Sequence, residues 1–171
     1  MTDATGGNLI APWPGPPWGG DSAAAFSALL TAYHLQTEHE KGQGVATAAD
    51  LPRRYRAEID DPASAFARDV VLLAGDGASA APVGCVVLSG AAEVKRLWVD
   101  PTARGQGLAT ALVRAAVDAA VVRGFTAVRL SVWEWRTGAL ALYERLGFEV
   151  VEPWDTRPGL VCLRWDAPTP R

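Results

Sequence analysis

Cysteine is scarce in this 171-residue sequence: only Cys85 and Cys162 occur, and each lies within an apolar, β-like run. The sequence contains no CxxC pair and no cluster of cysteine with histidine. That pattern argues against a zinc site and against a disulfide-based scaffold. We therefore expect two reduced thiols in the core and no bound metal.

The chain also has no excess of positive charge, because it contains sixteen lysines and arginines and nineteen aspartates and glutamates, which give a formal net charge of −3. Binding to nucleic acid or to an anionic membrane would need a basic patch, and neither partner is expected. No apolar run approaches membrane-spanning length, and residues 1–7 lead into no apolar stretch of the signal-peptide type. These absences together predict a cytoplasmic protein.

What the sequence does contain is the composition of an ordinary globular domain, with 49% apolar and 20% charged residues. A chain of this length fits a single domain and can bury a substantial core. We expect an irregular arm rich in glycine and proline over residues 1–21, one folded domain over 22–166 and a disordered tail over 167–171.

The spacing of apolar residues predicts the elements of that domain. A short strand is expected at 9–11, a helix at about 23–39 capped by Asp21 and Ser22, and a second helix at 47–59. The remaining strands are expected at 69–74, 82–90, 92–99, 127–133, 148–154 and 160–166, and the remaining helices at 108–122 and 137–146. This order predicts an α/β (α+β) domain with a mixed sheet.

A glycine-rich turn joins the strand at 92–99 to the long helix. The first amides of a helix lack internal partners and its N-terminus is electropositive, while glycine lets the main chain approach a ligand closely. The combination is suited to a pyrophosphate, to which an arginine can add a charge-assisted contact. The expected contact residues are Arg104, Gly105, Gln106, Gly107, Leu108, Ala109 and Thr110.

Three other interpretations of this turn compete with a pyrophosphate site. A dinucleotide fingerprint would need glycine at Thr110 and an acidic residue after the next strand, but only Asp118, inside the helix, is available. A Walker A loop would need a Gly-Lys-Ser/Thr triplet, which is absent. The third reading is a tight strand-to-helix turn with no ligand. A nucleotide- or NAD-binding oxidoreductase thus stays open as an alternative function.

Two longer segments resemble a known family. LWVDPTARGQGLATALV resembles motif A of the GNAT superfamily of N-acetyltransferases, with Arg104, Gly107 and Ala109 matching its signature, and TGALALYERLGFEVV resembles motif B. The resemblance covers about residues 83–152. It implies a mixed, mostly antiparallel sheet of six or seven strands with splayed central parallel strands and about four flanking helices.

The resemblance also implies acetyl-CoA as co-substrate. Its pantetheine arm would pair with the main chain of Leu97, Trp98 and Val99, and its pyrophosphate would lie over residues 104–110. Tyr143 occupies the position of the motif B tyrosine, from which a phenol can donate a proton to the departing thiolate. This chain has Arg136 where many members carry a cofactor-binding asparagine.

The acceptor side is less defined by the sequence. Glu93 resembles a catalytic glutamate of histone-acetyltransferase relatives, with an ordinary strand-entry carboxylate or a water chain as alternatives. The candidates for the acceptor pocket are His34, Glu38, Trp133 and Trp135. Acceptors from small amines to peptides stay open, with a weak preference for a cationic amine, and homodimers are common among similar proteins. A non-catalytic CoA-binding module on the same fold is the second hypothesis.

Overall fold

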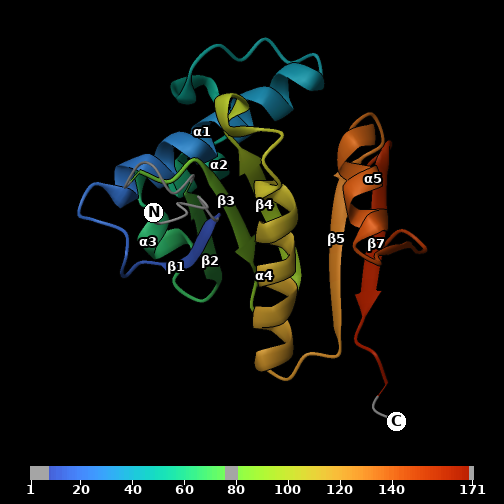
Figure 1. The fold of residues 1–171 in the computed structure, drawn as a ribbon. Coiled ribbons are helices and arrows are strands. Elements are labelled where there is room, and N and C mark those ends of the chain that lie inside the picture. Colours follow the sequence, from blue (N-terminus) through green and yellow to red (C-terminus); the bar gives the residue numbers. More distant parts are fainter. Residues whose placement is uncertain (1–7, 76–80, 170–171) are drawn as a thin grey trace.

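The computed structural model describes residues 8–75 and 81–169, which form one sheet flanked by helices on both faces (Figure 1). Within these residues the sheet has the strand order β1-β2-β3-β4-β5-β7-β6. The strands are β1 (Leu9–Trp13), β2 (Val70–Gly75), β3 (Gly84–Leu88), β4 (Glu93–Val99), β5 (Ala127–Trp133), β6 (Glu149–Val150) and β7 (Leu160–Asp166). The helices are α1 (Ser22–Glu40), α2 (Arg53–Asp60), α3 (Pro62–Ala65), α4 (Leu108–Val122) and α5 (Thr137–Arg145), with short 3-10 turns η1 (Ala48–Asp50) and η2 (Pro101–Ala103).

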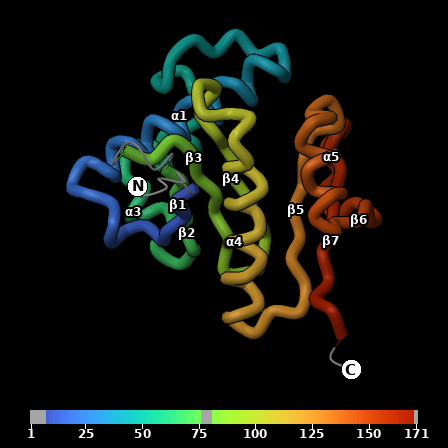
Figure 2. The backbone as a smooth tube through the Cα atoms, in the orientation of Figure 1, coloured from blue at the N-terminus to red at the C-terminus, as the bar shows by residue number. Residues whose placement is uncertain are grey.

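The sheet opens between its two central strands. All its neighbouring strands are antiparallel except β4 and β5, which run parallel and pair only through Glu93 with Arg129 and Val94 with Leu130. Beyond Val94 the two strands diverge, so that β5, β7 and α5 stand apart from β1–β4 in the tube view (Figure 2). The expected mixed sheet with splayed parallel strands is confirmed.

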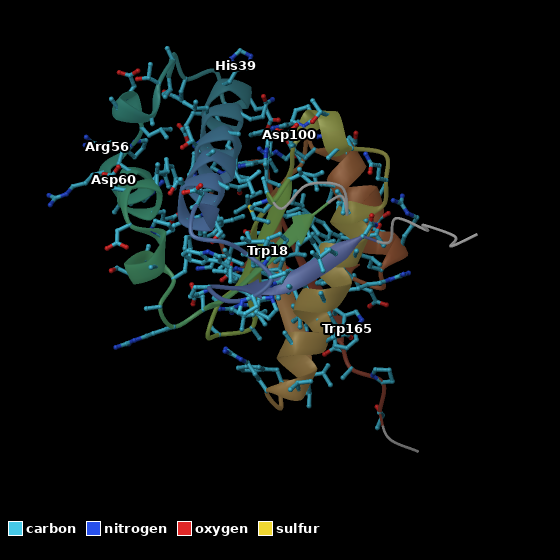
Figure 3. The ribbon with its side chains drawn as sticks, turned by 60° about the vertical axis from the view of Figure 1, so that its left-hand side comes forward. Trp18, His39, Arg56, Asp60, Asp100 and Trp165 are labelled. Carbon is cyan, nitrogen blue, oxygen red and sulfur yellow. The ribbon has the colours of Figure 1, made fainter. Side chains whose placement is uncertain are left out.

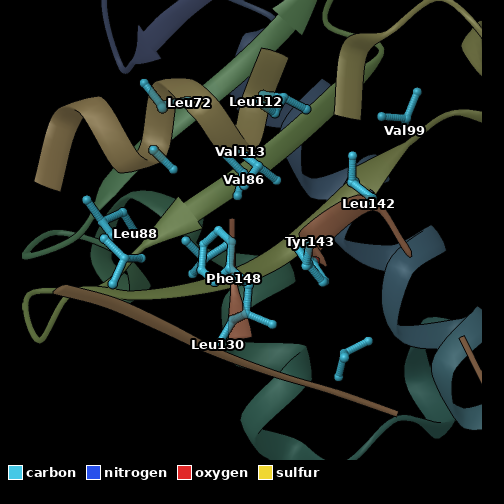
Figure 4. Packing of buried hydrophobic residues seen from close by; sticks show 14 of the residues in the cluster. Leu72, Val86, Leu88, Val99, Leu112, Val113, Leu130, Leu142, Tyr143 and Phe148 are labelled. Carbon is cyan, nitrogen blue, oxygen red and sulfur yellow. The ribbon is translucent and has the colours of Figure 1, made fainter. Parts of the chain in front are cut away.

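The sheet is buried on both faces, which explains why β2 and β3 are continuous apolar runs. Leu72 and Val86 face α4 in the larger apolar cluster, while their neighbours Val71 and Val87 belong to a second cluster with side chains of α1 and with Phe66, which follows α3. Figure 4 shows the larger cluster, where Tyr143 and other α5 side chains join those of α4 and the sheet. The split sheet is therefore anchored to a dense core around α4.

The structure corrects two expected helix features. The helix expected at 47–59 is broken, because Pro52 adopts an extended conformation and separates η1 from α2. Asp21 does occupy the N-cap position of α1 but its side chain makes no capping bond, and Ser22 Oγ instead accepts from Trp13 Nε1 at 3.0 Å. Further on, Asp61 caps α3 through Ser64 N–H at 3.1 Å.

The strand ends also differ in part from expectation. The early strand is confirmed and extends to Trp13, whereas the strand expected at 148–154 is reduced to the two residues of β6. Ala167, at the start of the expected tail, donates to Thr126 O at 2.8 Å, and residues 170 and 171 lie outside the described part. None of the described helices is long and apolar enough to cross a membrane.

A bulge in β4 breaks the two-residue alternation of side chains that a regular strand has. The register with β3 shifts between Cys85 and Val87, and opposite this shift Arg96 has a φ of +56°, a left-handed conformation rare for a residue with a side chain. As a result Val94 and Leu97, three positions apart, both pack toward the α4 side. Arg96 is thereby freed to point toward α1 and α2.

Candidate active site

The glycine turn presents unpaired main-chain amides at the start of α4. Gly105 and Gly107 are exposed and both have a φ of +78°. Among the described residues, no backbone hydrogen bond uses an N–H of residues 104–110, and a Cβ placed at Gly105 would meet nothing within 4 Å. Packed side chains therefore leave these amides open, as an anion site requires.

A small cavity of about 240 Å³ lies over this turn. Gly105, Gly107 and Thr110 line it from one side, and Gly138 and Leu142 of α5 line it from the other. The cavity is thus bounded by both halves of the split sheet. Its donor groups and its open shape fit a diphosphate, which needs several N–H donors and close approach of the main chain.

The main chain at the end of β4 only partly matches the expectation. Asp100 N–H donates to Val83 O at 2.8 Å, so the main chain of Asp100 points toward β3. Because peptide groups along a strand point alternately to its two sides, those of Trp98 also point toward β3, and those of Leu97 and Val99 point toward the open gap. Val99 O accepts from Arg104 Nε at 3.0 Å. Leu97 and Val99 therefore border the gap, whereas Trp98 contributes its ring, 4.9 Å from the Arg104 guanidinium.

Tyr143 lies on the inner face of α5 and borders the gap between β4 and β5. Only 6% of its surface is exposed, and its ring meets Phe148 edge-on at 5.8 Å. Burial raises the pKa of its phenol, so the hydroxyl stays protonated at neutral pH. Among the described residues no hydrogen bond engages that hydroxyl, which leaves it available to donate to a ligand.

A second cavity, of about 500 Å³, adjoins the first along α5 and β4. Its walls come from α1, α2, β4, β5 and α5, and Tyr143 borders it. We call it the acceptor cavity. A further cavity of about 590 Å³ near Trp154 is lined by neither the glycine turn nor Tyr143, so it has no part in this site.

A polar triad of buried His34 and partly buried Arg96 and Glu58 lies beside the acceptor cavity, which His34 and Arg96 line. Glu58 accepts two bonds from Arg96, at 2.7 and 2.8 Å, and contacts His34 Nε2 at 2.9 Å. Although burial opposes its ionisation, these bonds lower the pKa of Glu58 to about 2. Burial lowers the pKa of His34, so its imidazole is neutral at pH 7, and its ring stacks on Tyr55 at 4.1 Å.

The other expected acceptor residues are placed as follows. Glu93 lines the cavity where β4 and β5 still pair, with Arg129 Nη2 at 4.0 Å. Glu38 is buried, not solvated as a frayed helix end would be, and pairs with Lys41. Trp133 lines the cavity and stacks on Trp135 at 4.8 Å, whereas Trp135 is 41% exposed and lies outside it.

Arg136 closes the site and does not extend toward the glycine turn. Its Nε donates to Glu40 at 2.7 Å and its Nη2 to Thr37 Oγ1 at 2.7 Å, which joins the end of α1 to the start of α5 across the split sheet. Sequence reasoning missed this link and also missed Glu58 and Arg96. No local pattern marks them, because each contact joins residues that lie far apart in the sequence.

This arrangement is that of an acyl-CoA-type transferase domain: an open amide cradle and a phenol border one gap in a split sheet. The chain belongs to the acetyltransferase (GNAT) family, whose model matches residues 32–148. A mycothiol acetyltransferase from Clavibacter sepedonicus is 41% identical over 129 residues, which are 75% of this chain and 39% of that protein. This chain therefore spans less than half the length of that relative.

Other matches cover a larger share of the length of the matched protein. The peptidyl-lysine N-acetyltransferase YjaB of Salmonella typhimurium is 32% identical over 124 residues, covering 67% of this chain and 81% of that protein. A Klebsiella pneumoniae structure described as an acyl-CoA N-acyltransferase has a TM-score of 0.62 and 26% identity, covering 93% of this chain and 97% of its own. A GNAT structure from Elizabethkingia anophelis, solved with acetyl-CoA bound, shares the fold with a TM-score of 0.57 and 18% identity, over 93% and 97% of the two chains.

Proposed function

We propose that this chain transfers an acetyl group from acetyl-CoA to the nitrogen of a primary amine by direct attack, without a covalent enzyme intermediate. The observation that supports this most is the pairing of the open amides at 104–110 with Tyr143, which borders the same gap. The N–H groups of the turn would hold the diphosphate, and the gap-facing peptide groups of Leu97 and Val99 would hold the pantetheine amides.

The reaction requires two proton movements that this chain can serve. When bound, acetyl-CoA supplies a thioester carbonyl, and transfer forms a C–N bond while the C–S bond breaks. The leaving sulfur must gain a proton, which Tyr143 can donate because its phenol remains protonated. The amine must lose one, since an amine of this kind is mostly protonated at neutral pH.

Glu93, directly or through a water molecule, is the proposed acceptor of the amine proton. It lines the acceptor cavity, as does the neutral His34, whose Nε2 is engaged with Glu58. The variants Glu93→Gln and His34→Gln distinguish the two groups. The variant that removes the acidic limb of the kcat/KM pH profile identifies the base, and an unchanged profile in both would assign the step to solvent.

Membership of the family does not identify the class of acceptor. The two relatives described above are named for mycothiol and for peptidyl-lysine, so small molecules and peptide amines are both candidates. Incubation with acetyl-CoA and a panel of amines, with thiol release as the readout, tests the proposal. We expect turnover with at least one amine. Binding of CoA without turnover on any acceptor would instead assign the chain to a CoA-binding module.

A further inference from the structure

The acceptor cavity carries a positive lining, although the chain as a whole has a net charge of −3. Among the described residues that line it, Glu93 is the one carboxylate. Six cationic side chains line the same cavity: Lys41, Arg54, Lys95, Arg96, Arg136 and Arg157. A ligand that enters this cavity therefore meets an electropositive wall, whatever the charge of the surface outside.

Four of these cations have carboxylate partners, and none of those carboxylates lines the cavity. The pairs are Lys41 with Glu38 at 2.5 Å, Arg96 with Glu58 at 2.7 Å, Arg136 with Glu40 at 2.7 Å and Arg157 with Asp155 at 2.6 Å. Arg54 and Lys95 have no ion pair among the described residues. These two cations are thus the ones with charge left to offer a ligand.

Tyr55 adds a directed donor beside Arg54. Arg54 Nη2 donates to Tyr55 Oη at 2.9 Å, and its guanidinium lies 4.6 Å from the centre of that ring. Because the phenol oxygen is already accepting, its own hydrogen is left to donate, and no acceptor for it occurs in the described part of the chain. The guanidinium and the free O–H from α2 and the ammonium of Lys95 from β4 line the same cavity, and together they suit a carboxylate.

The aromatic wall of the cavity gives no room for a cation. Trp133 stacks on Trp135, and the Lys41 and Arg157 head groups already lie 5.7 and 5.6 Å from the centre of the Trp133 ring. A second positive group at this ring would meet like charge at close range. The geometry of this wall therefore does not favour the weak preference for a cationic amine.

We propose that the acceptor is a primary amine that also carries a carboxylate, such as an α-amino acid or a short peptide with a free C-terminus. Arg54, Lys95 and the Tyr55 hydroxyl hold the carboxylate, and the amine points toward Tyr143 and Glu93. The cavity of about 500 Å³ has the size of a small-molecule site. This inference rests on the proposed acetyl transfer and adds the class of acceptor to it.

A matched set of acceptors tests the inference with the wild-type chain. For each of several amino acids, kcat/KM is compared with that of its carboxamide and of the amine lacking the carboxyl group, at saturating acetyl-CoA. A charge-assisted contact makes a contribution of about 1.5–3 kcal/mol, so we expect the carboxylate form to be preferred by about tenfold or more. Equal or better turnover of the neutral forms would overturn the inference while leaving acetyl transfer intact.

Charge variants identify the side chains. Arg54→Gln and Lys95→Gln are expected to raise KM for the carboxylate acceptor by about tenfold each, without changing KM for acetyl-CoA. Arg56→Gln is the matched control, because Arg56 points outward from α2, away from the cavity (Figure 3). If the control variant shifts KM as much as the other two, or if no carboxylate-bearing amine is acetylated by the wild type, the inference is wrong.

Discussion

At the scale of single residues, the site combines groups whose surroundings fix their protonation. The phenol of Tyr143 is buried and stays neutral, whereas Glu58 is held ionised by Arg96 and His34. The pKa of Tyr143 is set mainly by burial, whereas hydrogen bonds outweigh burial in setting the pKa of Glu58. In the proposed mechanism Tyr143 provides a proton donor, whereas Glu58 holds His34 and Arg96, which line the acceptor cavity. Each group leads to a separate prediction.

Substitution Tyr143→Phe tests the proton donor. It removes the hydroxyl, which has no partner among the described residues, and preserves the packing against Phe148. We expect kcat to fall by about 100-fold, in the range typical of a lost general acid, while the Kd for CoA measured by calorimetry stays within about twofold. A parallel loss of CoA affinity or of thermal stability would assign Tyr143 a structural role instead.

Substitution Glu58→Gln tests the triad through pH. Because the folded pKa of Glu58, about 2, lies below the ordinary glutamate value of 4.5, its carboxylate stabilises the fold fully above pH 4.5, and this contribution is lost as the pH falls toward 2. The variant should be less stable than wild type by about 2 kcal/mol at pH 7. Urea unfolding across pH 7 to 3 should show the difference shrinking below pH 4.5. A constant difference would contradict the assignment.

At the scale of elements, the bulge in β4 is what turns Arg96 toward Glu58 and leaves the end of the strand facing the gap. A left-handed φ of +56° is costly for arginine, and the two bonds to Glu58 offset that cost. The bulge and the triad therefore depend on each other. The helices tie the two halves of the sheet in a second place, where Arg136 bonds to Glu40 and Thr37.

The pair Arg96→Ala and Arg96→Gly separates backbone strain from the ion pair. Both variants lose the contacts to Glu58, but only glycine adopts a positive φ without steric cost. We expect the glycine variant to be more stable than the alanine variant by about 1 kcal/mol, a reversal of the usual order of these residues inside a strand. Unfolding free energies from urea titration measure the difference. Greater stability of the alanine variant would mean that the bulge is absent.

At the scale of the whole molecule, the sequence predicted the half of the site that is built from local pattern. The strand, glycine turn and helix over 92–122 could be recognised because each is specified by neighbouring residues. The acceptor half could not, since it depends on a one-residue bulge at Arg96, on a helix broken at Pro52 and on side chains that meet across the fold, such as Glu58 and His34. The net charge of the chain also gave a misleading expectation, because the described residues that line the cavity include six cations and one carboxylate, Glu93.

The claim on which the whole account depends is that the main-chain amides of residues 104–110 hold a diphosphate. Calorimetric titration of the intact chain with CoA and with pantetheine, which lacks the diphosphate, tests it most directly. We predict that CoA binds and that pantetheine binds about 100-fold or more weakly, since at least two charge-assisted hydrogen bonds are lost. Equal affinity for the two compounds, or no binding of CoA, would contradict the account.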